Sequence, residues 1–330
     1  LSAGGTVEIE IVWSFLVPQS GATRMGHLSR DMYMLAYWFP KIAVFDDLRG
    51  WDAEPYLGIG EFYDGFADYE VELTVPAGWM VMATGNLENP EGVFSAQTRS
   101  RMADALAADT MVHIVTQGDL ESGAVTEPSE SGTLMYRFLA ENVRDFVWMA
   151  SSTHIWTGTS ALVPDRDGDG GDDRVAIHAF WREDVAPLWA EEPFYAKQAI
   201  EFESRFTGIS YPWPHMTSVE GTGIIDGGME YPMFTLMDNG EAYGAAGLFD
   251  LTTRDPLVST QVDQVLVHEP RPRWQILLGG QLLDLVKTNL HKVRRLGTVN
   301  RQPDRREHTT QRLVVFLLDL TILLTSVVVR

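Results

Sequence analysis

Polar and apolar residues alternate along much of the first half of the chain, as in half-exposed antiparallel strands. The clearest stretch is residues 69–75, which read YEVELTV. Further runs rich in β-branched or aromatic residues predict strands at 7–12, 68–75, 79–84, 134–139 and 175–180. Turn residues at 76–78 and 85–86 separate them, and one helix is predicted at 98–108. This succession predicts an antiparallel, β-sandwich-like domain over residues 1–185.

After residue 185 the period becomes helical. Residues 196–206 place Ala196, Ile200, Phe202 and Phe206 near helical spacing. Two strands are predicted at 216–220 and 228–236. A further helix is then predicted, since apolar residues at i, i+4, i+7 and i+8 share one helical face: Val258, Val262, Val265 and Leu266.

Composition indicates a globular protein with two unlike parts. The chain has 330 residues, no cysteine and a net charge of -21. Residues 270–330 hold eleven basic and four acidic side chains, a net of +7. The preceding residues hold 14 basic and 42 acidic ones, a net of -28. Such an acidic body repels nucleic acid, so nucleic-acid binding is not expected. The missing thiols exclude disulfides and cysteine-ligated metals.

The candidate chemistry lies in two short motifs. Residues 227–233 read GGMEYPM, and His268-Glu269 follow about forty residues later, where the predicted helix ends. This arrangement resembles the aminopeptidase N family of zinc metallopeptidases. The resemblance implies an α+β fold in which the first part of a thermolysin-like catalytic domain, residues 186–269, follows the β-rich domain. It also implies a peptide substrate with a free amino terminus.

The same resemblance implies roles for individual residues. Glu230 would bind the substrate's α-ammonium, since a carboxylate at a strand end pairs well with a cation. Gly227, Gly228 and Met229 would let the peptide backbone approach that strand. His268 would be a zinc ligand and Glu269 the general base acting on the metal-bound water.

The β-rich region supports this resemblance with segments in the family's order. The family's domain usually begins with further strands, so the N-terminus resembles a truncated one. The matching segments are 37–40 (YWFP), 45–47 (FDD), 60–63 (GEFY), 75–79 (VPAGW) and 83–86 (ATGN).

The zinc motif itself is interrupted. The family's helix carries H-E-x-x-H, but the sequence continues Pro270-Arg271-Pro272, which puts proline in place of the second histidine. Prolines in a helix interior each cost roughly 3 kcal/mol. The third ligand, a glutamate in the family, would fall near His291. The family's cofactor is zinc, and this chain is predicted not to bind it. Tyr231 also departs from the family, which usually has asparagine there.

The abrupt changes at residue 270 suggest an interpretation of the tail. The composition changes there from acidic to basic, only Trp274 and Phe316 of the 35 aromatic residues lie in the tail, and the zinc motif breaks off within one helical turn. Residues 270–330 are therefore interpreted as an out-of-frame tail that follows a truncated catalytic domain. Two alternatives remain open: a non-catalytic peptide-binding module, and a protein tethered to a membrane through residues 313–329. The latter stretch is short for a span and contains Asp319.

A second metal site is suggested by residues 165–170, which read DRDGDG. Asp165, Asp167 and Asp169 match the first half of a calcium loop, with carboxylates at alternate positions and glycine at the turn. The twelfth position is Ala176, where that loop needs glutamate, and Asp172 or Asp173 could substitute. A polar hairpin loop without metal is the alternative.

Overall fold

The computed structural model describes most of the first 238 residues and two strands near the C-terminus. The described residues are 7–19, 24–54, 63–185, 189–225 and 228–238, together with the backbone of residues 310–318 and 321–329. The architecture is α+β, mostly sheet with few helices. The α+β class predicted from the sequence is thereby confirmed.

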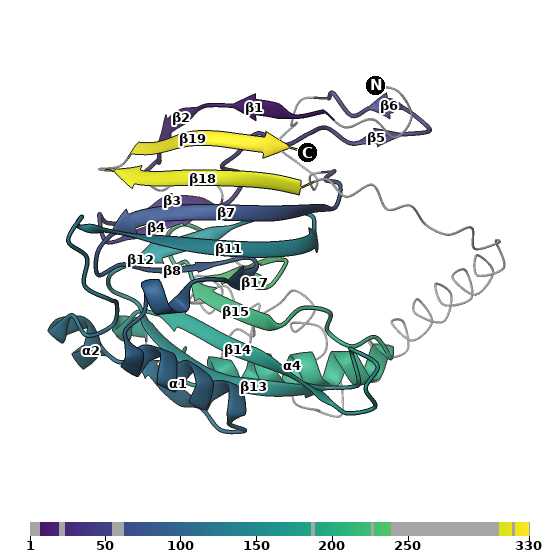
Figure 1. Ribbon diagram of the computed structural model, residues 1–330. Helices are drawn as coiled ribbons and strands as arrows, with labels where there is room; N and C mark the ends of the chain where they lie inside the picture. Colours follow the sequence, from purple (N-terminus) through teal and green to yellow (C-terminus); the bar gives the residue numbers. More distant parts are fainter. Residues whose placement is uncertain are drawn as a thin grey trace, which may run out of the picture.

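The first sheet joins strands from both ends of the described chain (Figure 1). Its order is β1 (Ile9–Ile11), β19 (Thr321–Val329), β18 (Thr310–Leu318), β7 (Ala67–Pro76), β11 (Thr133–Val143) and β9 (Asn86–Leu87), and β2 (Ser14–Leu16) also pairs with β19. The alternation predicted along β7 is confirmed. Val71, Leu73 and Val75 are buried, whereas Glu70 and Thr74 are partly exposed.

A four-stranded sheet contributes to the same core. Its order is β3 (Met25–His27), β4 (Met32–Leu35), β12 (Trp148–Ser151) and β8 (Met80–Ala83). Every residue of the last three strands is buried. Aromatic rings join this sheet to β7 and β11: Phe146, just before β12, lies near Tyr69 of β7 and packs edge-on against Phe138 of β11. A separate hairpin is formed by β5 (Phe45–Asp46) and β6 (Gly50–Trp51).

The third sheet is mixed and carries the candidate site. Its order is β10 (Val112–Val115), β13 (Ile155–Val163), β14 (Asp173–Trp181), β15 (His215–Glu220), β17 (Phe234–Met237) and β16 (Gly228–Tyr231). β14, β15 and β17 run parallel to one another, and β16 is antiparallel to β17. One face joins the large core through Phe180, Val219 and Phe234. The other packs on a helix.

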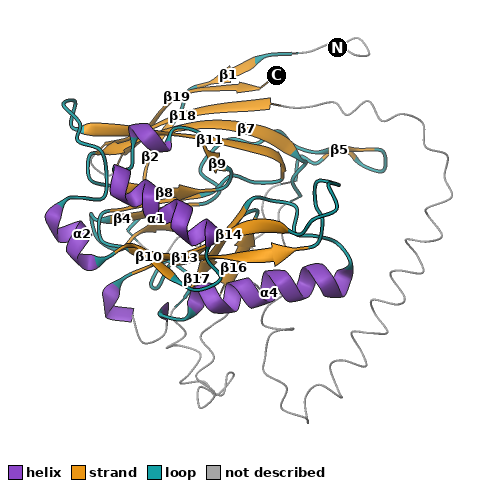
Figure 2. Cartoon of the chain, turned by 60° about the horizontal axis from the view of Figure 1, so that its bottom comes forward, coloured by secondary structure: helices purple, strands orange, loops and turns teal. Residues whose placement is uncertain are grey.

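That helix is α4 (Glu192–Thr207), which lies mainly across β13 and also reaches β14 and β15 (Figure 2). Ala196 and Ile200 of α4 pack with Val175 and Met216 from the sheet. Gly208, at φ 69°, ends the helix in the left-handed conformation that glycine adopts readily. The other helices are α1 (Ala96–Ala107), α2 (Gln117–Ser122), η1 (Pro90–Gly92) and η2 (Glu183–Val185).

The strand predicted at 228–236 is wrong as a single element. The structure divides it into β16 and β17, an antiparallel pair joined by a tight turn at Pro232 and Met233. Pro232 has no backbone donor for a strand ladder, and Met233 has a left-handed φ of 61°. The hydrophobic pattern is continuous through this turn because Met233 is itself buried.

Strands from both sides of the expected domain boundary at residue 185 belong to the mixed sheet. β10, β13 and β14 precede residue 185 and the other strands of the mixed sheet follow it.

The segment 313–329, considered above as a membrane tether, includes parts of β18 and β19, which form a hairpin. Within the described residues, no helix is long and apolar enough to cross a membrane. The domain limits and the out-of-frame tail stay predictions.

Candidate functional site around strand β16

Strand β16 is the edge of the mixed sheet, and it carries the residues that the sequence singled out. One side pairs with β17, with Gly228 opposite Met237 and Glu230 opposite Thr235. No strand among the described residues pairs with the other side. Glu230 is exposed, while Met229 packs partly on the core. An extended peptide can add to such an edge through main-chain hydrogen bonds.

Gly228 is not required by the packing around it. An added Cβ would meet a single described atom within 4 Å, the carbonyl oxygen of Leu236 at 3.7 Å. By contrast, a Cβ at Gly85 would come within 2.6 Å of the Leu139 carbonyl oxygen, and the φ of Gly85 is +91°. The glycine at 228 therefore leaves room along the strand edge, as close approach of another backbone requires.

The turn between β16 and β17 is fixed from two sides. The Thr84 hydroxyl donates a hydrogen bond to the Pro232 carbonyl oxygen at 3.1 Å. The Thr217 backbone N–H donates to the Met233 carbonyl oxygen at 3.0 Å. These bonds attach the hairpin to the end of β8 and to β15, so the edge strand is held by rigid elements.

Tyr231, which stands where the resembled family has asparagine, is a core residue. It is 6% exposed, and its ring packs edge-on against Tyr37 at a centroid distance of 6.0 Å. Arg24 Nη1 donates to the Tyr37 hydroxyl at 2.8 Å. Burial raises the pKa of the Tyr231 hydroxyl far above its usual range. The residue therefore serves packing, and it faces away from the exposed Glu230 beside it.

A second glutamate, Glu220, ends β15 and is fully buried. Arg182 binds it with two hydrogen bonds, Nε to Oε2 at 2.7 Å and Nη2 to Oε1 at 2.9 Å. His154 Nε2 lies 3.6 Å from Oε2, and the Thr222 N–H donates to Oε1 at 2.9 Å. Burial disfavours the charged carboxylate, but the bonds from His154 and Arg182 outweigh it and lower the Glu220 pKa to about 2.

This network holds the segment that leads into β16. A tight turn starts at Gly221, whose carbonyl oxygen accepts from the N–H groups of Ile224 and Ile225. The Gly221 N–H donates to the Met237 carbonyl oxygen at 2.7 Å. Residues opposite each other on neighbouring strands share a sheet face. The pairings of Glu220 with Met237 and of Met237 with Gly228 therefore place Glu220 and Glu230 on one face.

Two histidines on neighbouring strands are structural. His215 Nε2 donates to the Gly85 carbonyl oxygen at 2.9 Å, so Nδ1 is left to accept from the Thr217 hydroxyl at 3.1 Å. His178 Nδ1 accepts from the Trp156 indole at 3.3 Å. Burial lowers the pKa of His178 to about 3 and that of His215 to about 4, so both rings are neutral at pH 7.

The acidic loop differs from the predicted calcium loop in one ligand. The carboxylates of Asp165, Asp167 and Asp173 lie within 4.8 Å of one another, and Asp169 is not part of this group. Asp169 instead accepts from the Gly171 N–H. Asp173 begins β14, and the tight turn of the loop returns the chain beside Asp165. Asp165 already accepts from the N–H groups of Gly168 and Gly170. The calcium hypothesis stays a prediction.

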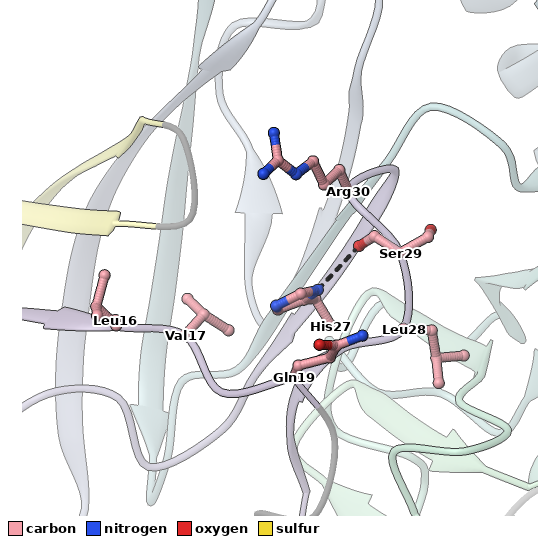
Figure 3. Close-up of a pocket in the computed structure, with 7 residues that line it drawn as sticks. All are labelled: Leu16, Val17, Gln19, His27, Leu28, Ser29 and Arg30. Atoms are coloured by element: carbon pink, nitrogen blue, oxygen red, sulfur yellow. Dashed lines mark hydrogen bonds between the residues drawn. The ribbon is translucent and has the colours of Figure 1, made fainter.

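A pocket of about 390 Å³ lies beside the turn between β3 and β4 (Figure 3). His27 Nδ1 donates to the Ser29 carbonyl oxygen at 3.1 Å within it. Its charged lining residue, Arg30, is exposed. Its lining residues are Leu16, Val17, Gln19, His27, Leu28, Ser29 and Arg30. None of them is a residue that the sequence singled out.

Three of the predicted site residues, Gly227, His268 and Glu269, lie outside the described residues. Within the described part, the aspartate group above is the one set of three or more side chains able to hold a metal, and it contains no histidine. No protein-family model matches the chain, and a search of curated proteins gave no match either.

Proposed function

We propose that the chain is the amino-end-recognition part of a zinc aminopeptidase and binds peptides that have a free amino terminus without hydrolysing them. The supporting observation is the position of β16. It is the edge strand of the mixed sheet, with an exposed carboxylate at Glu230 and an uncrowded backbone at Gly228.

The proposed binding mode follows from this geometry. A peptide adds to the open edge of β16 as a further strand, and its backbone groups pair with those of residues 228–231. Its terminal ammonium pairs with Glu230 in a charge-assisted hydrogen bond. An acetylated peptide lacks that charge. Helix α4 and the strands β15, β17 and β16 that follow it support the further proposal that residues 186–269 are the first part of a thermolysin-like domain behind a β-sandwich-like one.

Zinc chemistry is not part of this proposal because the donor set does not fit. A zinc site in an enzyme of this kind needs three protein ligands. The sequence offers His268 but proline at position 272, and the described residues contain no histidine-bearing metal group. We expect far less than one zinc per chain after dialysis against dilute zinc. About one zinc per chain that is lost on His268→Ala would overturn the binding-only function.

Peptide binding tests the role of Glu230. Fluorescence anisotropy should show weaker binding of acetylated peptides than of the same peptides with a free amino end. Glu230→Gln should weaken binding of the free peptides by about tenfold and leave that of the acetylated ones unchanged. Glu91→Gln, the same change at an exposed glutamate on η1, is the matched control. Equal losses on both peptides would mean that Glu230 does not recognise the amino end.

A further inference from the structure

The pocket beside the turn between β3 and β4 lies between two short segments of the chain (Figure 3). Three residues of the segment 16–19 line one side of it, and residues 27–30 line the other. Its volume of about 390 Å³ is within the range of small-molecule sites. None of the lining residues belongs to β16, so the pocket is separate from the proposed peptide-binding edge.

Backbone hydrogen bonds and packing fix both sides of the pocket. The His27 N–H donates to the Pro18 carbonyl oxygen at 3.0 Å, and Gln19 forms a β-bridge with His27. β3 is in turn paired with β4. Leu28 lies against the backbone of Gly223, since a Cβ added to that glycine would come within 2.6 Å of the Leu28 side chain. The pocket is therefore formed by the folded chain before any ligand binds.

His27 contributes a buried polar atom to this pocket. The residue is 7% exposed, and its Nδ1 donates to the Ser29 carbonyl oxygen at 3.1 Å. The other ring nitrogen, Nε2, has no hydrogen-bond partner among the described residues, and in Figure 3 it points away from Ser29. In the neutral ring this nitrogen is an acceptor. Because buried polar groups normally have a partner, Nε2 is a contact point for a ligand that offers an N–H.

Two more polar side chains line the pocket, and both are exposed: the Arg30 guanidinium and the Gln19 amide. Neither has a hydrogen bond or an ion pair with another described residue. Asp31 follows Arg30 in the chain, but no carboxylate is among the described lining residues. A guanidinium binds a carboxylate through two parallel hydrogen bonds. The polar lining therefore favours a ligand that has a carboxylate.

The rest of the lining is mainly apolar. Val17 is buried, Leu28 is partly buried and Leu16 is 71% exposed. Apolar walls with a few polar groups are typical of small-molecule sites, and they favour a ligand that has an aliphatic part. Inorganic phosphate has no such part, so the lining favours an organic carboxylate over a phosphate ion.

We propose that this pocket binds an aliphatic amino acid residue whose carboxylate is free and whose nitrogen is acylated. The carboxylate pairs with Arg30 and with the Gln19 amide. The amide N–H of the ligand donates to His27 Nε2, and the aliphatic side chain lies against Val17 and Leu28. This chemistry is shared by N-acylated amino acids and by the carboxyl end of a peptide. The inference is independent of the function proposed for β16, because its ligand needs no ammonium group.

Calorimetric titration of the full chain with N-acetyl-leucine tests the site. This probe should bind roughly tenfold more tightly than N-acetyl-leucinamide, which lacks the carboxylate, and than inorganic phosphate, which lacks the aliphatic part. Arg30→Gln should abolish the preference for the acid. Arg49→Gln, the same change at an exposed arginine outside the pocket, should retain it. No binding of N-acetyl-leucine, or equal binding of the acid and the amide, would overturn the proposal.

N-methylation of the probe tests the contact with His27. N-acetyl-N-methyl-leucine has no amide N–H, so it should bind roughly fivefold more weakly than N-acetyl-leucine. Equal binding of the two probes would overturn the role assigned to Nε2.

A charge added to the lining tests where the ligand lies. Leu16 is exposed, so Leu16→Glu and its uncharged control Leu16→Gln should both fold. The glutamate should weaken binding of N-acetyl-leucine roughly threefold relative to the glutamine, because it repels the carboxylate of the probe. Equal affinities in the two variants would place the ligand outside this pocket.

Acetyl-glycyl-leucine distinguishes the two sources of the ligand. Binding as tight as that of N-acetyl-leucine would assign the site to peptide carboxyl ends, and loss of binding would restrict it to N-acylated amino acids. Glu230→Gln should leave the binding of N-acetyl-leucine unchanged, since the probe has no ammonium. A loss in that variant would mean that the probe binds at β16, and it would overturn the separate pocket.

Discussion

Glu220 and Glu230 lie on the same face of the mixed sheet, yet their surroundings are opposite. Glu220 is fully buried and is held by Arg182, His154 and the turn at Thr222. Glu230 is exposed on the edge strand. Glu220 is the last residue of β15 and Glu230 is the last but one of β16. The sequence predicts a strand at each of these positions. The difference lies in the strands on either side.

The comparison separates a positioning role from a binding role. Glu220 fixes the turn that leads to β16, and it has no exposed surface for a ligand. Glu230 is exposed on the strand that follows, and no described strand pairs with the outer side of that strand. A binding site needs a rigid support and an accessible contact group. Glu220 belongs to the support, and Glu230 is the contact group.

Removal of the buried carboxylate should have the largest effect. Glu220→Ala leaves the Arg182 guanidinium without its two-bond partner, and breaking a buried pair typically costs 3–5 kcal/mol, as a rough range. Glu230→Ala should change the free energy of unfolding by less than about 0.5 kcal/mol, because surface substitutions usually do. Urea unfolding of both variants measures this. Similar losses would mean that the two glutamates do not divide support from binding.

Acidification should lower the free energy of unfolding through three ionisable groups of the mixed sheet, His178, His215 and Glu220. The folded pKa values of His178 and His215 are about 3 and about 4, below the ordinary 6.5, and that of Glu220 is about 2, below 4.5. The folded chain therefore binds fewer protons than the unfolded chain, and stability falls as pH decreases. The two histidines lower the stability as the pH falls below 6.5, and Glu220 lowers it further below pH 4.5.

The expected loss at pH 5 is on the order of 1–2 kcal/mol per histidine, measured by urea unfolding at pH 7 and pH 5. His215→Asn should reduce this loss. Glu220→Gln should change the slope only at more acidic pH. A stability that is constant between pH 7 and pH 5 would contradict the buried, neutral state of the two rings.

The smallest effect on stability is expected at the binding edge. Gly228→Ala should cost under about 1 kcal/mol, because a Cβ there meets no close described atom. The matched control, Gly85→Ala, should cost more, roughly 2 kcal/mol, since φ is +91° and a carbonyl oxygen lies 2.6 Å away. Gly228→Ala should still weaken binding of the free-amino peptides. Unchanged binding would argue against a backbone approach at β16.

The sequence by itself determined the local elements. Period-two alternation identified the region of β7, and helical spacing identified α4. The helix predicted at 98–108 is observed as α1, two residues earlier at its start, because Ser95 accepts from the Thr98 N–H and caps it. These features depend on neighbours within one turn or one strand, which a sequence displays directly.

Tertiary structure decided which of these elements faces a partner and which faces solvent. The sequence does not show that β16 is an edge, that Asp169 is left out of the acidic group, or that Arg182 and His154 meet at Glu220. Each fact joins residues that are distant in sequence or separated by a turn. Such contacts depend on sheet order and register, and the hydrophobic pattern of a strand specifies its buried face but not its neighbour.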